Sequence, residues 1–193
     1  MMGLTDRYSV QPSPLDEEAL QIELAANPAI SPQEYAKKLA ESKAHALAQH
    51  MASSSTKYDH ESSLILGSDT IVDLNGIILE KPKNEDDAKR MLSSLSGSWH
   101  EVHTGVALYK MSHDNDGIDL ISSFTDTARV KFAILSPEDI DAYVKTGEPM
   151  DKAGSYGIQG IGGQMVERIE GDFFAVMGLP MHRLSRVFAN ALA

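Results

Sequence analysis

The sequence predicts an α/β protein in which helices flank a central, mixed and twisted β-sheet. Three observations support this prediction. The run Leu64 to Leu66 is short and wholly apolar, as in a buried strand. Asn75-Gly76 separates two further apolar runs, which is typical of a hairpin with a type I′ turn. Capped helices with apolar residues at helical spacing begin near Ser31 and Asn84. We expect a single domain over residues 1–193, because this length supports one substantial core.

Composition narrows the class of protein. The chain has no cysteine, which excludes a disulfide scaffold and thiolate chemistry and fits a reducing compartment. Its net charge of −11 argues against nucleic acid or an anionic membrane surface as a general partner. No run of about 18 apolar residues and no apolar signal region is present. We therefore expect a soluble, cytoplasmic protein.

The N-terminal part contains a charge at an unexpected place. Tyr8 to Val10 could form a short strand, and the acids Asp16 to Glu18 suit a solvated helix start. A helix should run from Ser31 to about His50, and Lys43 falls within its apolar stripe. That lysine either extends along the surface to reach solvent or points into an anion-binding cleft. The Ser-rich residues 50–63 suggest a flexible polar loop.

The hairpin brings polar residues together at its open end. The two-residue turn sets Leu74 opposite Ile77, so Thr70 should face Lys81, with Asp69 one step beyond. An acid, a hydroxyl and a lysine would then meet. Because neighbouring strand residues point to opposite faces, this cluster requires a local bend or a strand end at Asp69. The plainer alternative is that these are ordinary polar residues at a strand end.

The second half of the chain is expected to add strands and helices in alternation. Predicted elements are a helix from Asn84 to Gly97, strands near 101–110 and 118–135, a helix from Ser136 to about Gly147, a hairpin of 164–170 with 173–177, and a helix from Pro180. His100 and His103 should point to opposite faces of a strand. No zinc spacing is evident, so we expect structural histidines, while a hard-cation site made from carboxylates remains open.

The segment Asp151 to Gly163 is rich in glycine, which indicates close backbone approaches. Its spacing matches neither a P-loop nor a dinucleotide-binding loop. Lys152 could meet a phosphate and Gln159 a base edge. A purely structural turn is the alternative.

Three segments together resemble the Maf family of nucleoside triphosphate pyrophosphatases. They are GSDTIVDLNGIILEKP, LSGSWHEVHTGVAL and AYVKTGEPMDKAGSYGIQGIGGQMVERIEGDFFAVMGLP, and the resemblance covers nearly the whole chain from about Val10. The EKP and YGIQG sequences are similar to the dTTP/UTP-hydrolysing branch. The resemblance implies a Maf/ITPase-like fold with a cleft between two lobes.

The resemblance also implies roles for individual residues. Catalysis would involve Asp69, which accepts a proton and binds metal, Glu17 as a second metal-linked acid, and Lys81. The triphosphate would be held by Lys43, Lys152 and again Lys81. Thr70 and Gln159 would select the pyrimidine base. The implied cofactor is Mg²⁺ or another divalent cation such as Mn²⁺. The implied reaction converts dTTP or UTP to the nucleoside monophosphate and pyrophosphate. The resemblance further implies a role in nucleotide-pool cleaning and a possible homodimer.

One family feature is missing. Family members begin with an apolar strand that ends in a Ser-x-Ser-Pro-Arg-Arg-like motif, and this sequence has none. Ser13-Pro14 is followed by Leu15 and Asp16, and Arg7 is isolated. We expect either a truncated sequence or a naturally short member. A catalytically impaired module that still binds nucleotide, and a pyrophosphatase with another base preference, are therefore alternative functions.

Overall fold

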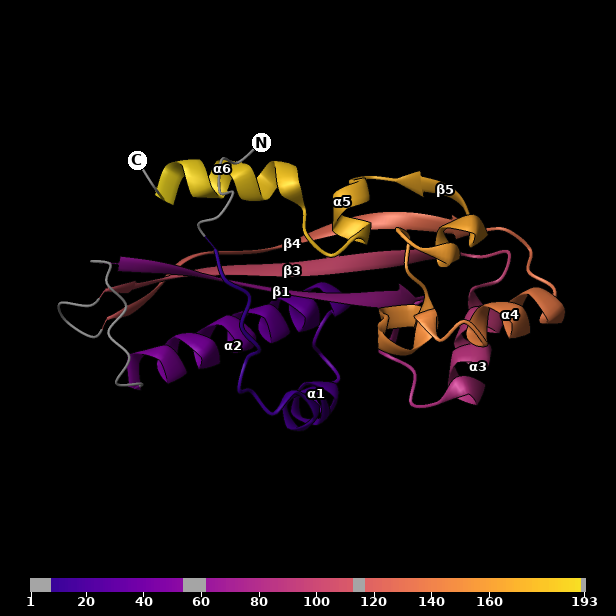
Figure 1. The fold of residues 1–193 in the computed structure, drawn as a ribbon, viewed down its shortest axis with the longest axis horizontal. Coiled ribbons are helices and arrows are strands. Elements are labelled where there is room, and N and C mark those ends of the chain that lie inside the picture. The colour runs from indigo at the N-terminus through magenta and orange to yellow at the C-terminus, as the bar shows by residue number, and fades with distance from the viewer. Residues whose placement is uncertain (1–7, 54–61, 113–116, 192–193) are drawn as a thin grey trace.

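A computed structural model describes residues 8–53, 62–112 and 117–191 (Figure 1). Its helices and strands, in chain order, are α1 (Glu17–Ala25), α2 (Pro32–Ser53), β1 (Ser62–Leu74), β2 (Ile77–Leu79), α3 (Glu85–Leu95), β3 (Trp99–Ser112), β4 (Ile118–Phe132), α4 (Pro137–Val144), β5 (Val166–Glu170), α5 (Phe173–Val176) and α6 (Met181–Ala191). Three short 3₁₀ helices, η1 (Glu148–Asp151), η2 (Ala153–Ser155) and η3 (Ile161–Met165), lie between α4 and β5. Among the described residues, no helix is long and apolar enough to cross a membrane.

The predicted α/β class, with helices around a central sheet, is confirmed. The strand order is β2-β1-β3-β4-β5, and each neighbouring pair is antiparallel. The expectation of a mixed sheet is wrong for these strands. The pairing is antiparallel because each connection between paired strands, whether a hairpin turn or a longer segment with helices, starts and ends at the same end of the sheet.

The predicted hairpin is confirmed in turn and register. Leu74 pairs with Ile77, and Asn75 and Gly76 both have positive φ, at 54° and 87°. The expected polar loop over 50–63 is corrected at both ends, because α2 continues to Ser53 and β1 already begins at Ser62. The rest of that loop lies outside the described residues.

Two predicted strands are wrong. Tyr8 to Val10 has no regular secondary structure, and Tyr8 and Val10 are 74% and 88% exposed, so no apolar contact holds them extended. Residues 173–176 form the short helix α5 in place of a hairpin strand. Asp172 caps this helix by accepting a hydrogen bond from the Phe174 amide at 2.9 Å, which favours a helical turn.

Helices cover both faces of the sheet, and α3 and α4 close one end (Figure 1). α2 lies against one face, with α1 outside it, while α5 and α6 lie on the opposite face. The core around α3 and α4 contains Leu92 and Phe132, both fully buried. This arrangement leaves β1 near the edge of the sheet, between the two helical layers.

The close approach of α2 to the sheet depends on two glycines. A Cβ atom at Gly105 would lie 2.3 Å from the carbonyl oxygen of Ala36, and one at Gly67 would lie 2.6 Å from that of Ala40. Both neighbours are backbone atoms, which cannot move aside without shifting the helix. The helix therefore sits closer to the strands than any larger residue would allow.

We predict that Gly105→Ala destabilises the protein by about 3 kcal/mol, because the added methyl group overpacks a helix backbone. Urea unfolding measures this change. Gly157→Ala is the control, since the nearest atoms to its Cβ would be side-chain atoms of Lys152 and Glu148, at 3.3 Å or more, and not a helix backbone. Equal effects of the two substitutions would contradict the close-approach argument.

Candidate active site

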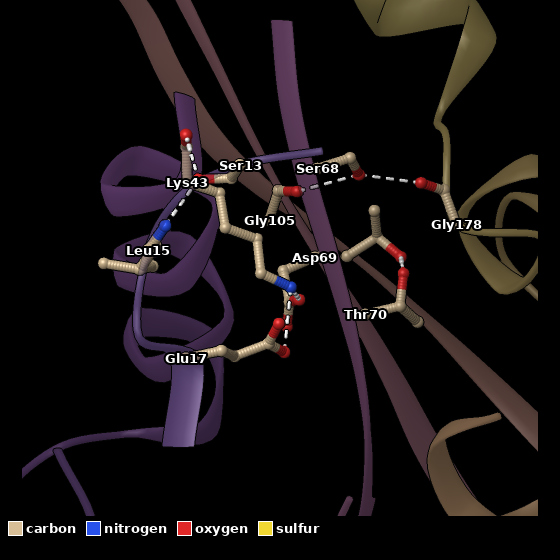
Figure 2. Close-up of polar contacts among 10 residues, drawn as sticks. Ser13, Leu15, Glu17, Lys43, Ser68, Asp69, Thr70, Gly105 and Gly178 are labelled. Carbon is tan, nitrogen blue, oxygen red and sulfur yellow. Dashed lines mark hydrogen bonds and ion pairs between the residues drawn. The ribbon is translucent and has the colours of Figure 1, made fainter. Parts of the chain in front are cut away.

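A lysine and two carboxylates form an ion-pair cluster between α1, α2 and β1 (Figure 2). The Nζ atom of Lys43 lies 2.5 Å from Oδ1 of Asp69 and 2.9 Å from Oε1 of Glu17. The Lys43 side chain is only 20% exposed. Lys43 therefore points toward two carboxylates and does not extend into open solvent, while its role in binding an anion stays a prediction.

The segment before α1 positions Glu17. Ser13 Oγ donates a hydrogen bond to the Lys43 carbonyl at 2.9 Å and accepts one from the Leu15 amide at 3.3 Å (Figure 2). Asp16 caps α1 by accepting from the Ala19 amide. The acidic run is a helix start, as expected, and its second member also reaches the lysine.

Burial and charge set the protonation of this cluster. Burial raises the pKa of Asp69; the ammonium of Lys43 opposes that shift, and the Glu17 carboxylate adds to it. Burial alone would lower the pKa of Lys43, but Asp69 and Glu17 hold it above its usual value. The lysine therefore stays charged and balances two acids in a poorly solvated place.

A third acid, Glu80, adjoins the cluster and was not singled out from the sequence. Its Oε1 atom is buried and has no hydrogen-bond partner among the described residues. Burial raises the Glu80 pKa to about 7, although a hydrogen bond from the Tyr35 hydroxyl opposes the shift. Glu80 is the first residue of the EKP sequence, but no local signal indicated that it is buried, because its burial depends on packing near Tyr35 of α2.

The edge of β1 explains how residues on opposite faces reach one space. β2 pairs only with Val72–Leu74, so within the described chain no strand lies outside β1 before Val72. Asp69 points toward α2, whereas Thr70 points toward α5, where Thr104 donates to the Ala175 carbonyl. No local bend is needed, because a pocket that wraps around this edge contacts both faces.

This pocket has a volume of about 580 Å³, within the range of small-molecule sites. Six of the seven predicted site residues line it: Lys43, Asp69, Thr70, Lys81, Lys152 and Gln159. Glu17, the seventh, is not in the lining and contacts it through Lys43. The positive charge of Lys81 acts to lower the Asp69 pKa, consistent with the two side chains facing the same space.

The glycine-rich wall of the pocket is built around Glu148. Its carboxylate accepts hydrogen bonds from the Tyr143 hydroxyl at 2.9 Å and from the Ile161 and Gly162 amides at 2.9 and 3.0 Å. A Cβ at Gly160 would lie 2.4 Å from this carboxylate. The segment is thus both a structural turn and a pocket wall. Sequence analysis missed Glu148, since nothing local distinguishes it from a surface acid.

Hydrogen bonding fixes the proton of the Thr70 hydroxyl. Thr104 Oγ1 donates its only proton to the Ala175 carbonyl at 2.7 Å. The 2.8 Å contact between Thr70 and Thr104 therefore requires Thr70 to be the donor (Figure 2). Thr70 keeps only acceptor lone pairs for a ligand. On the same face, Ser68 Oγ lies 2.7 Å from the Gly178 carbonyl and fixes the chain after α5.

The donor set at the ion-pair cluster suits a hard cation. Asp69 and Glu17 offer carboxylate oxygens, and both already contact one cationic nitrogen, that of Lys43. Mg²⁺ is commonly held by one or two carboxylates together with substrate phosphates. The residues present therefore fit a magnesium ion bound together with a phosphorylated ligand.

The two histidines lie on opposite faces of β3, as predicted, and outside this cluster. His100 is buried against Phe132 and shares a 2.9 Å hydrogen bond with the Tyr156 hydroxyl, so it is structural. Burial lowers the His100 pKa to about 4, which keeps the ring neutral. His103 faces Asp73 and Glu101.

The chain is similar to known proteins over most of its length. The sequence profile of the family described as "Maf-like protein" matches residues 1–191. The dTTP/UTP pyrophosphatase of Clostridium perfringens strain SM101 is 46% identical over 144 residues, 75% of this chain and 72% of the relative. That of Methylobacillus flagellatus is 40% identical over 183 residues, 95% and 81% of the two chains. A human "probable bifunctional dTTP/UTP pyrophosphatase/methyltransferase protein" is 40% identical over 181 residues, 93% of this chain and 28% of the relative.

We predict that stability falls as the pH rises through the pKa of Glu80. The folded-state pKa of about 7 exceeds the ordinary value of 4.5, so the folded protein binds more protons than the unfolded chain between these values. The free energy of unfolding should fall by about 2 kcal/mol between about pH 5 and about pH 8.

Glu80→Gln should flatten this dependence, as measured by urea unfolding at several pH values. Glu85→Gln, at an exposed position in α3, is the matched control and should leave it unchanged. A pH dependence that survives in Glu80→Gln would assign the effect to other groups.

Proposed function

The chain belongs to the Maf family, and on that premise we propose that it hydrolyses dTTP and UTP to the nucleoside monophosphate and pyrophosphate. The carrying observation is the pocket that joins the acid Asp69 to Lys43, Lys81, Lys152 and Gln159. The relatives from Clostridium perfringens and Methylobacillus flagellatus are named dTTP/UTP pyrophosphatases, which supports the substrate class.

Lysines supply the positive charge that a triphosphate needs in an acidic protein. Lys43, Lys81 and Lys152 all line the pocket, although the chain carries a net charge of −11. Lys152 Nζ lies 2.6 Å from Asp151, an exposed acid that a phosphate could replace as its partner. The attraction of phosphate groups is thus confined to the pocket, and this also disfavours long nucleic acids as partners.

Asp69 would act as the general base. Its burial raises its pKa toward the range in which a carboxylate accepts protons effectively at neutral pH. Water would attack the α-phosphorus and form a new P–O bond. A proton of this water would pass to Asp69. The bond from the α-phosphorus to the bridging oxygen breaks, and Lys81 and Lys152 stabilise the charge on the departing pyrophosphate.

Asp69 and Glu17 are the residues that would hold a divalent cation, Mg²⁺ or Mn²⁺. When bound, this ion would offset phosphate charge and lower the pKa of a water ligand. Lys43 contacts both carboxylates, so it holds them in place and can turn toward phosphate when a cation takes over their charge.

The state of Thr70 supports a preference for thymine or uracil. Its hydroxyl proton is committed to Thr104, so Thr70 can only accept from a base. Thymine and uracil carry a proton on N3, whereas N3 of cytosine is an acceptor. Gln159, whose amide both donates and accepts, can meet a neighbouring carbonyl oxygen of the base.

The family and the composition support a proposal about the wider setting of the activity. We place the protein in the cytoplasm, acting on the nucleotide pool, and as a possible homodimer. The competing function is a module of the same family that binds nucleotide without turnover. A third possibility is hydrolysis with a different base preference.

We predict magnesium-dependent pyrophosphate release from dTTP and UTP in preference to CTP, ATP and GTP. Asp69→Asn should lower the rate by about 10²–10⁴-fold, because it removes the general base. A coupled pyrophosphate assay measures both effects. Asp119→Asn, at an exposed position of β4, is the matched control.

Each other outcome selects an alternative. A folded protein whose melting temperature rises with dTTP but which releases no pyrophosphate is a binding module. Release from purine nucleotides at equal rates would overturn the assignment of Thr70 and Gln159 to pyrimidine selection.

A further inference from the structure

A second cluster of ligand-type side chains lies on β1 and β3, beyond the ion-pair cluster. Asp73 and Glu101 are directly paired across the two strands, and His103 follows Glu101 on the same face of β3. One ligand atom from each of these three residues lies within 4.8 Å of the others. Asp73 is four residues from Asp69, which is about 13 Å along a strand. The two clusters are therefore separate.

The His103 ring has an unsatisfied nitrogen aimed at the two acids. The side chain is 0% exposed, and its Nε2 atom has no hydrogen-bond partner among the described residues. It lies 3.6 Å from Oδ2 of Asp73 and 3.5 Å from Oε2 of Glu101. These distances are long for hydrogen bonds. They are close to the separation of about 3.3 Å between two ligands of a tetrahedral zinc ion.

Each of the two buried ligands is oriented by a further contact. His103 Nδ1 shares a 2.8 Å hydrogen bond with Thr127 Oγ1, and a proton on Nδ1 would leave the Nε2 lone pair free. Asp73 Oδ1 accepts from the Gly76 amide at 2.6 Å, which leaves Oδ2 facing the histidine. The hairpin turn and β4 thus fix the donor atoms before any ion binds.

The two carboxylates of the cluster are paired only with His103 in the part of the chain that the structure describes. In residues 8–53, 62–112 and 117–191, neither carboxylate forms an ion pair with a lysine or arginine. Arg129, the cross-strand partner of Glu101 on β4, instead lies 3.0 Å from Glu170 and over the ring of Trp99. Two carboxylates and a neutral imidazole leave a charge that a divalent cation would balance.

We propose that Asp73, Glu101 and His103 bind a divalent transition-metal ion of the Zn²⁺ class. An imidazole with two carboxylates suits zinc, whereas Mg²⁺ prefers an all-oxygen set. The Glu101 side chain is 40% exposed, so the ion can enter and a water can fill its fourth position. The ion joins the β1–β2 hairpin to β3, next to Val72 and Val102, which line the nucleotide pocket. This proposal depends on no step of the proposed hydrolysis.

Zn²⁺ titration of the whole chain in excess Mg²⁺, by calorimetry and thermal unfolding, tests the site. The magnesium fills all-oxygen sites, so that zinc reports on the imidazole-containing one. Wild type should bind one equivalent and show a higher melting temperature. Glu101→Gln and His103→Gln should each weaken binding by about 100-fold, since even the loss of an outer-shell contact costs 10–100-fold. Glu167→Gln, at an exposed position of β5, is the control.

A nitrogen-detected NMR spectrum of the histidines separates metal binding from a simple ion pair. Zinc should shift Nε2 of His103, while a protonated His103 that only pairs with the acids would not respond. Zinc binding that is equal in wild type, Glu101→Gln and His103→Gln would overturn the proposal. So would the absence of binding by folded wild type. Because Glu101 is partly exposed, its variant remains informative if His103→Gln fails to fold.

Discussion

The contact between Lys43 and Asp69 organises the candidate site, and it depends on how closely α2 packs on the sheet. Gly67 and Gly105 leave no side chain between helix and strands, so the lysine of α2 reaches the carboxylate of β1. A buried carboxylate without this partner would carry an uncompensated charge. The ion pair in the pocket therefore depends on the close packing of the α2 backbone against the sheet.

The edge of β1 gives the pocket its mixed chemistry. Strand alternation sends Asp69 toward α2 and Thr70 toward α5, and an edge lets one ligand contact both. The ion-pair cluster of Lys43, Asp69 and Glu17 lies on the α2 side of this edge, and the hydroxyl group of Thr70 lies on the α5 side. The glycine-rich wall, held by Glu148, faces this edge. The separation fits a nucleotide, whose two ends differ in the same way.

Local features were predictable from the sequence, and long-range ones were not. The Asn75-Gly76 turn fixed the hairpin register, and Ser136 and Asp139 formed the capping box of α4, because short-range geometry determines both. The run 173–176 was wrongly expected to be a strand, since so short an apolar segment suits either structure until its cap is recognised.

The same distinction holds for the site. Six of the predicted residues line the pocket. They could be predicted largely because the Maf-like segments contain them. Glu80 and Glu148 were missed, because their importance arises from packing and hydrogen bonds that join distant parts of the chain. The roles of the six in catalysis and binding remain predictions.

Phosphorus NMR of dTTP incubated with the protein and Mg²⁺ tests the central claim most directly, because it identifies which phosphate bond breaks. The proposed function predicts cleavage between the α- and β-phosphates, with dTMP and pyrophosphate appearing in equal amounts. Formation of dTDP and orthophosphate would place the attacking water at the wrong end of the triphosphate. That result would contradict the assignment of Asp69 as the base beside the α-phosphate.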